Sequence, residues 1–213
     1  MNKDFDIAIL LFDGITPLDA IGPFDVLGKV PGAHVKCVGK KTGLVRTKGL
    51  SLGLNVDYTL ADVTAPDILL VPGGPGADPS AEDPEIVDWV KSVHQTTTWT
   101  TSVCTGALVL AAAGVLNGLE ATTHWRAMET LKDFGATPVR KRVVKQGKVV
   151  TAAGVSSGID MALSLAADIA GEEIAKAIQL GIEYDPEPPF DAGDFETAPP
   201  ERVELVRSTL ARP

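Results

Sequence analysis

The sequence predicts an α/β fold: a three-layer sandwich in which a mostly parallel central sheet is flanked by helices. Two observations carry this prediction. Continuous apolar runs at residues 7–12 and 68–71 are typical of strands buried on both faces, as in a parallel sheet. Such runs alternate with segments whose apolar residues recur at helical spacing, as expected of strand–helix–strand units.

The N-terminal part begins with the strand at residues 7–12, which ends at an Asp-Gly turn. Pro17 suits the first turn of a helix that runs to about residue 27. A second strand is predicted at residues 35–39. Residues 44–56 are expected to form a β excursion, because a helix there would be interrupted by Gly43, Gly49 and Gly53.

The central part contains two strands and two helices. The strand at residues 68–71 runs into the sequence Pro-Gly-Gly-Pro-Gly, and residues 84–93 have the pattern of an amphipathic helix. Residues 97–103 are rich in β-branched side chains and predict a strand. The Ala- and Leu-rich residues 107–113 predict the helix that follows it.

The C-terminal part is predicted to mix short strands with helices. A strand at residues 121–123 leads into a helix at 124–131, and residues 139–144 and 148–152 predict a hairpin around Gln146-Gly147. A long helix follows the Gly-Val-Ser-Ser-Gly-Ile-Asp sequence of residues 154–160, and another covers residues 172–184. Residues 185–213 are expected to form a loop and a short helix at about 200–210.

Length and composition favour one domain, residues 1–213, with a core large enough to need no covalent staples. The 28 acidic and 19 basic residues give a net charge of −9, which disfavours nucleic acid and anionic membrane as partners. Two cysteines make no disulfide framework, and no signal peptide or membrane span is recognisable, so a cytoplasmic location is expected. No Cys/His cluster has metal-ligand spacing.

Cys104 is the strongest candidate for a reactive group. It lies in the sequence Ser-Val-Cys-Thr-Gly between a predicted strand and a predicted helix, a turn known as a nucleophile elbow. The positive end of a helix favours thiolate over thiol, and its unpaired N–H groups can meet a developing negative charge. A lone cysteine is more often a small buried hydrophobe, but the elbow favours the functional interpretation. Cys37 has no such context and is expected to pack in a strand.

Asp19 and the glycine-rich residues 72–76 fall where further parts of a site are expected, since parallel strands end at a common edge. The glycines allow either a close ligand approach or a plain turn, and the absence of Gly-Lys-Ser/Thr excludes a P-loop. Asp19 either complements the helix N-terminus or stands beside the thiol. In the second case the two acids share one proton, and a protonated Asp19 is a proton donor.

His124 and the Ser156–Ser157–Asp160 group are weaker candidates. A Cys–His pair is a common nucleophile and base, yet His124 begins a predicted helix and no acid follows it to orient the ring, which disfavours direct catalysis. Ser156 or Ser157 with Asp160 is interpreted as helix capping.

Several of these segments together resemble the ThiJ/PfpI superfamily, which shares the flavodoxin-like fold of class I glutamine amidotransferases. The resemblance rests on the Ser-Val-Cys-Thr-Gly elbow, the Pro-Gly-Gly strand end, Ala-Thr-Thr-His-Trp at residues 121–125 and the Leu-Phe-Asp-Gly segment of residues 11–14. It extends to the Gly-Val-Ser-Ser-Gly-Ile-Asp segment and to the C-terminal Glu-Tyr-Asp-Pro sequence. The resemblance implies a homodimer and no metal or organic cofactor.

Differences between this sequence and the superfamily's subgroups reduce the number of activities that the resemblance implies. Thr105 stands where the proteases have histidine, and no late His-x-Glu of the amidotransferases follows Cys104. Glyoxalase- and deglycase-like members carry glutamate where this chain has Asp19. Aspartate at that position together with Cys-Thr-Gly is similar to the isocyanide-hydrating members. Regulators of the AraC type share Cys-Thr-Gly, but they append a DNA-binding domain for which this chain is expected to be too short and too acidic.

The resemblance therefore implies a hydro-lyase that converts small organic isocyanides to N-substituted formamides. Cys104 would attack the isocyanide carbon to give a thioimidate, Asp19 would protonate it, and Thr105 would position Asp19 or water through its hydroxyl. Substrate binding is expected at Gly73, Gly74, Gly154 and His124. Two alternatives stay open: a glyoxalase- or deglycase-like enzyme acting on α-oxoaldehydes, and a non-enzymatic redox sensor or holdase in which Cys104 becomes a sulfinate.

Overall fold

The computed structural model describes residues 4–47, 49 and 52–210, with the backbone alone described for residues 209 and 210. Its main sheet has seven strands in the order β10-β11-β7-β6-β1-β2-β5. Every neighbouring pair is parallel except β10 and β11. The strands are β1 (Phe5–Leu10), β2 (Ala33–Gly39), β5 (Tyr58–Thr59), β6 (Ile68–Val71), β7 (Trp99–Val103), β10 (Val143–Gln146) and β11 (Val149–Ala152). The mostly parallel sheet expected from the apolar runs is confirmed.

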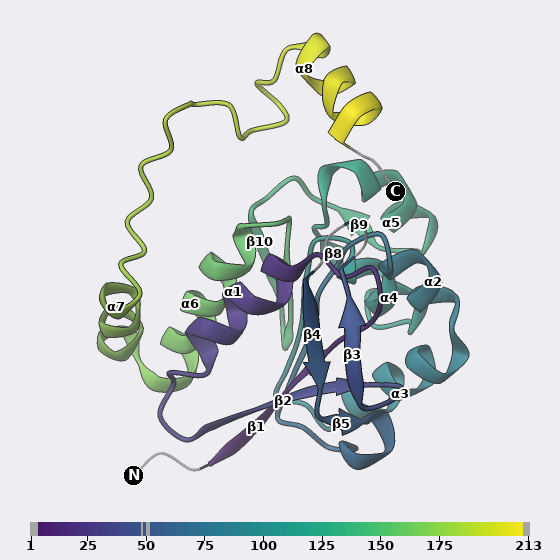
Figure 1. The fold of residues 1–213 in the computed structure, drawn as a ribbon, viewed down its shortest axis with the longest axis vertical. Coiled ribbons are helices and arrows are strands. Elements are labelled where there is room, and N and C mark those ends of the chain that lie inside the picture. Colours follow the sequence, from purple (N-terminus) through teal and green to yellow (C-terminus); the bar gives the residue numbers. More distant parts are fainter. Residues whose placement is uncertain (1–3, 48, 50–51, 211–213) are drawn as a thin grey trace.

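Helices cover both faces of the sheet and complete three layers (Figure 1). On one side α1 (Pro17–Leu27) packs against α6 (Ser157–Ala170), which in turn contacts α7 (Glu172–Gly181). The other side carries α2 (Ala77–Glu82), α3 (Pro84–His94), α4 (Gly106–Ala112) and α5 (Met128–Asp133). A last helix, α8 (Pro200–Leu205), continues into a π-helical turn at Val206–Leu210 after a long loop from α7 (Figure 1).

Two small sheets lie outside the main one. β3 (Gly43–Arg46) and β4 (Gly53–Val56) form the antiparallel β excursion, of which residues 48, 50 and 51 lie outside the described residues. β8 (Glu120–Ala121) pairs with β9 (Thr137–Pro138) in parallel. Single 3₁₀ turns occur at Leu60–Asp62 and Trp125–Ala127.

Several element boundaries differ from the sequence-based expectation, and at three of them a local hydrogen bond competes with the expected element. The strand of residues 97–103 begins at Trp99, because Thr97 donates to His94 O at the end of α3. The strand of residues 139–144 begins at Val143, because Val139 N donates to Ala121 O and not to the main sheet.

The strand of residues 121–123 ends at Ala121, because Thr122 and Thr123 turn their polar groups to the Thr151 hydroxyl and to Cys104 O. The helix expected at residues 172–184 ends at Gly181, and Glu183 adopts φ 49° shortly afterwards. The helix expected at 124–131 starts as the 3₁₀ turn, and α2 had no predicted counterpart.

The register of the parallel strands determines where the site lies. Val71 of β6 pairs with Ser102 of β7, and Ser102 pairs in turn with Thr151 of β11. The chain therefore leaves β6, β7 and β11 at one edge of the sheet, close to the start of α1. Within the described residues, no helix is long and apolar enough to cross a membrane.

Candidate active site

Cys104 occupies the turn between β7 and α4 in a left-handed backbone conformation, with φ 58°. A non-glycine residue in this region stores strain that its surroundings must hold in place. Two hydrogen bonds do so: Cys104 N donates to Ala152 O over 3.0 Å, and Cys104 O accepts from the Thr123 hydroxyl over 2.8 Å. The cysteine is only 5% exposed, so the elbow presents a nearly enclosed sulfur.

Asp19 lies in the first turn of α1 and is completely buried. Its Oδ2 accepts a hydrogen bond from Gly73 N over 3.0 Å, while Oδ1 is buried without a conventional hydrogen-bond partner among the described residues. Burial raises the pKa of the carboxyl to about 7, against the lowering effects of the Gly73 N–H and of the Cys104 thiol. A carboxyl with this pKa exchanges its proton near neutral pH.

Cys104 and Asp19 form one coupled acid pair. Burial raises the pKa of the Cys104 thiol, and the neighbouring Asp19 charge raises it further. The N–H and hydroxyl of Thr105 act in the opposite direction but do not compensate. The expectation that the helix N-terminus makes the cysteine an easily formed thiolate is therefore wrong, because desolvation exceeds the effect of the short α4. The pair instead carries a single negative charge over a wide pH range.

Thr105 connects the elbow to the glycine-rich turn after β6. Its hydroxyl accepts from Gly74 N over 2.9 Å and lies 3.1 Å from Gly74 O, to which it can donate. The hydroxyl therefore holds Gly74, in contrast to the expectation that it positions Asp19 or water. This bond occupies the Gly74 N–H, so the substrate binding expected at Gly74 does not use this donor. The Thr105 N–H remains a donor toward the sulfur, whose pKa it lowers.

Gly73 stands between the two acids, and only glycine fits there. A Cβ at Gly73 would lie 2.5 Å from Thr105 N and 2.9 Å from the Cys104 Cβ. Gly74 has φ 126°, and its own Cβ would lie 2.4 Å from Thr16 N. The turn thus brings the backbone of Gly73 close enough to bond the Asp19 carboxyl while the elbow packs against its other side.

Gly154 and His124 lie on the remaining side of the sulfur. A Cβ added to Gly154, whose φ is 153°, would be 3.3 Å from Cys104 Sγ and 3.1 Å from His124 Cδ2. His124 Nδ1 accepts a long hydrogen bond of 3.4 Å from Arg126 N. Burial, and then the Arg126 charge, lower the pKa of His124, which favours the neutral ring. Within the described residues no hydrogen bond joins His124 to Cys104.

The capping role expected for Ser156, Ser157 and Asp160 is wrong. Ser156 precedes α6 but makes no capping hydrogen bond with its side chain. The Ser157 hydroxyl accepts from Gly154 N over 2.7 Å, and Asp160 pairs with Arg142. Ser156 and Asp160 thus contact Arg142 from a distant segment, whereas the Ser157 hydroxyl bonds within the turn before α6.

Two contacts of the C-terminal segment had no signal in the sequence. The Trp125 ring stacks on Phe195, with centroids 4.6 Å apart, and the Arg140 guanidinium lies 5.0 Å from the centre of the Phe195 ring. The segment is thereby fixed beside His124, whose ring is 5.4 Å from that of Trp125. Local sequence patterns do not show which distant loop a half-buried aromatic ring will meet.

No group of three or more His, Cys, Asp or Glu side chains in the described part of the chain could hold a metal ion. What the arrangement supplies is a buried thiol, a carboxyl of nearly neutral pKa and closely packed backbone around them. Such a pair can add a nucleophile and a proton to one small substrate.

Comparisons with known proteins agree with this geometry. An isonitrile hydratase of Pseudomonas putida is 42% identical over 205 residues, which cover 96% of this chain and 90% of the relative. A ThiJ/PfpI family protein from Pseudomonas syringae matches with a TM-score of 0.92 at 36% identity, covering 97% of this chain and 87% of that one. Drosophila melanogaster DJ-1beta matches with a TM-score of 0.76 at 26% identity, covering 86% of this chain and 98% of that one.

A family model described as the DJ-1/PfpI family matches residues 6–168, from β1 into α6. The matched range includes Asp19, the glycine-rich turn, the cysteine elbow and Gly154. With more than half of its length matched by the family model, and with the fold and elbow described above, this chain belongs to the DJ-1/PfpI family.

Proposed function

We propose that this protein hydrates organic isocyanides, also called isonitriles, to N-substituted formamides. The observation that carries the proposal is the buried Cys104–Asp19 pair, which shares one proton between a nucleophile and an acid. The identity of 42% over 96% of the chain to an isonitrile hydratase supports a hydro-lyase of this substrate class. A terminal isocyanide carbon both accepts a nucleophile and becomes basic, so it needs the two groups together.

The first half of the reaction forms a thioimidate. The singly charged pair rests as a thiol and an Asp19 carboxylate, because the carboxyl has the lower pKa. Transfer of the thiol proton to Asp19 gives the reactive form, a thiolate beside a protonated Asp19. Cys104 Sγ attacks the terminal carbon of R–N≡C, the new C–S bond forms, and the Asp19 proton moves to the same carbon. The product is R–N=CH–S–Cys104 and an ionised Asp19. Gly73 N, which donates to Asp19 Oδ2, stabilises the carboxylate as its charge develops.

The second half restores the reactive form of the pair. Asp19 takes a proton from water while the hydroxide adds to the thioimidate carbon. The hydroxyl proton passes to the nitrogen, the C–S bond breaks, and R–NH–CHO leaves with the thiolate restored. A carboxyl with a pKa of about 7 suits both the donation and the acceptance of a proton.

The enclosure of the sulfur favours this substrate class. At 5% exposure, Cys104 offers little room for a branched electrophile. An isocyanide ends in a linear C–N unit whose reactive atom is the last one, so it can reach a sulfur behind a narrow opening. We propose Gly73, Gly74, Gly154 and His124 as the walls around this atom, with His124 as a neutral contact.

Steady-state formation of formamide from an aryl isocyanide by the reduced protein tests the proposal. We expect turnover by the wild type and by Cys37→Ala, whose half-buried thiol lies on β2, and none by Cys104→Ala. Absence of turnover by the folded, reduced wild type would overturn the isocyanide proposal. Methylglyoxal as a second substrate then distinguishes α-oxoaldehyde chemistry from a redox or binding role.

We further propose that the protein is a homodimer and acts in the cytoplasm as one domain of residues 1–213. Both cysteines are free, which suits a reducing compartment. Three apolar side chains of α1 are exposed: Leu18 at 41%, Ile21 at 41% and Phe24 at 45%. Because they share one face, a second copy related by a two-fold axis can bury them against the same three residues.

The mass measured by light scattering after gel filtration tests the dimer. We expect Phe24→Glu to lower the mass toward that of one chain. Phe190→Glu serves as the matched control, since Phe190 is 77% exposed and belongs to the loop before α8, not to α1. A wild-type mass equal to one chain would contradict the dimer.

A further inference from the structure

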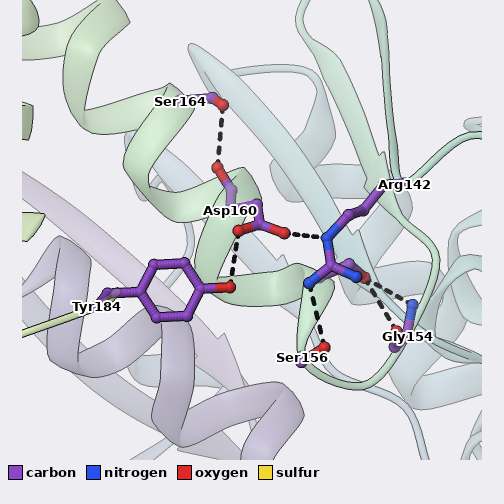
Figure 2. A network of polar contacts seen from close by, with 7 residues as sticks. Arg142, Gly154, Ser156, Asp160, Ser164 and Tyr184 are labelled. Carbon is purple, nitrogen blue, oxygen red and sulfur yellow. Dashed lines mark hydrogen bonds and ion pairs between the residues drawn. The ribbon is translucent and has the colours of Figure 1, made fainter. Parts of the chain in front are cut away.

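A network of polar side chains lies beside the active site but takes no part in the mechanism above (Figure 2). Arg142, just before β10, forms an ion pair through Nε with Asp160 of α6 and donates from Nη2 to the Ser156 hydroxyl over 3.1 Å. The Tyr184 hydroxyl donates to the other oxygen of Asp160, Oδ1, over 2.8 Å. Three distant segments of the chain therefore meet at one carboxylate.

Arg142 is bonded to both ends of the turn that precedes α6. Its carbonyl oxygen accepts from Ala153 N over 2.9 Å, while its guanidinium holds Ser156 and Asp160. Inside the turn, the Ser157 hydroxyl accepts from Gly154 N over 2.7 Å and lies 3.3 Å from Gly154 O. Arg142 thus holds Ala153 and Ser156, which flank Gly154, and the Ser157 hydroxyl bonds Gly154 itself.

The same turn and the first residues of α6 lie against the reacting groups. The nearest neighbours of a Cβ at Gly154 would be His124 and Cys104, with Sγ at 3.3 Å. A Cβ at Gly158 would lie 3.0 Å from Val103, the residue before Cys104. A Cβ at Gly22 of α1, the helix that carries Asp19, would lie 3.0 Å from Ile159. A displacement of this turn therefore changes the surroundings of both acids.

We propose that Arg142, Asp160 and Tyr184 form a positioning network that holds the turn of residues 153–156 against the Cys104 sulfur. The expected effect of the network on turnover rests on the proposed isocyanide hydration, whereas its effect on the position of the turn does not. The network sets the gap in which the isocyanide carbon, and then water, meet the sulfur. Because near-attack geometry is sensitive to shifts of about 1 Å, loss of the network lowers turnover without removing a reacting group.

The alternative is an ordinary surface ion pair, since the Asp160 side chain is 30% exposed and that of Arg142 is 53% exposed. The chain provides a matched control for this alternative. Lys145 of β10 pairs with Asp168 of α6 over 2.8 Å, with side chains 47% and 37% exposed. That pair joins β10 to α6 further from the turn, so Asp168→Asn removes a comparable ion pair without touching residues 153–156.

The experiment compares Asp160→Asn with Asp168→Asn by two readouts. The first is the rate of iodoacetamide alkylation at Cys104 relative to Cys37, followed by peptide mass spectrometry. Cys37 on β2 is half-buried and lies outside the turn and the elbow, so it serves as the internal reference for alkylation. The second is kcat and KM for formamide formation. If Asp160→Asn does not fold, Tyr184→Phe, which removes only one hydroxyl, takes its place.

For Asp160→Asn we expect the Cys104 to Cys37 alkylation ratio to rise at least about threefold and kcat to fall about tenfold or more, with a smaller change in KM. Asp168→Asn should leave both at the wild-type value. The proposal is overturned if the two variants give the same ratio, or if the ratio rises while kcat stays unchanged. The alkylation ratio needs no substrate, so failure of the isocyanide assay in the wild type leaves this test of the geometry intact.

Discussion

Replacing Asp19 by asparagine changes how the stability of the protein depends on pH, and the structure gives the size of the effect. The side chain is completely buried, and burial raises its pKa from 3.8 to about 7. Because the folded-state pKa lies above the unfolded one, the protonated carboxyl favours the folded state. That contribution is fully present below about pH 3.8 and is lost as the pH rises through about 7.

The expected magnitude follows from the two pKa values. A shift of the Asp19 pKa from 3.8 to about 7 means that ionisation of this side chain lowers the free energy of unfolding by about 4 kcal/mol at alkaline pH. Between about pH 5 and about pH 8.5, the linkage relation assigns about 3 kcal/mol to this group. Asparagine does not ionise. The unfolding free energy of Asp19→Asn, relative to wild type, should therefore increase by about 3 kcal/mol between these two pH values.

Urea denaturation of both proteins at the two pH values measures the difference. Groups that titrate in both proteins cancel, and repeating the pair in a Cys104→Ser background removes the coupling of Asp19 to the thiol. A difference that stays constant to within about 0.5 kcal/mol would refute the raised pKa and, with it, the proton sharing that the mechanism uses.

Three other predictions concern the same site. The kcat/KM for formamide formation should rise with pH to a plateau through an apparent pKa near 7, because the reactive pair must carry one negative charge; a flat profile from about pH 5 to 9 would contradict this. Gly73→Ala should lower the unfolding free energy in urea by about 3 kcal/mol or more, because its Cβ would meet backbone 2.5 Å away, whereas Gly181→Ala, with open space at that point, should change it by less than about 1 kcal/mol. Thr105→Val, which removes the hydroxyl bonded to Gly74, should cost about 1–3 kcal/mol in the same assay, and Thr105→Ser should restore most of it; equal values for the two variants would rule out the hydroxyl contact as the cause.

The sequence was sufficient to predict the sheet and the edge at which the site lies. Continuous apolar runs such as Ile68–Val71 are a local signal of a strand buried on both faces. Once a parallel sheet is assumed, the strand ends must lie together, which placed the glycine-rich turn and Cys104 at one edge. The positive φ at Cys104 agrees with the elbow expected from the residues around it.

The properties that depend on long-range packing could not be predicted. The pKa of Cys104 is raised because several distant segments enclose it, and this desolvation has no signature within the Ser-Val-Cys-Thr-Gly sequence. Thr105 and Asp160 carry polar groups whose partners, Gly74 and Arg142, come from other turns. Local capping rules gave Asp160 a plausible role, but the ion pair with Arg142 replaced it.

The most direct test of the central claim is the kcat/KM of Cys104→Ser for formamide formation, measured beside the wild type. The account makes sulfur the nucleophile that forms the thioimidate, so it predicts a loss of at least about 1,000-fold, since a serine hydroxyl is far less acidic than a thiol and does not give up its proton to the neighbouring Asp19. A Cys104→Ser protein within about tenfold of the wild type would show that water adds without a covalent intermediate on sulfur.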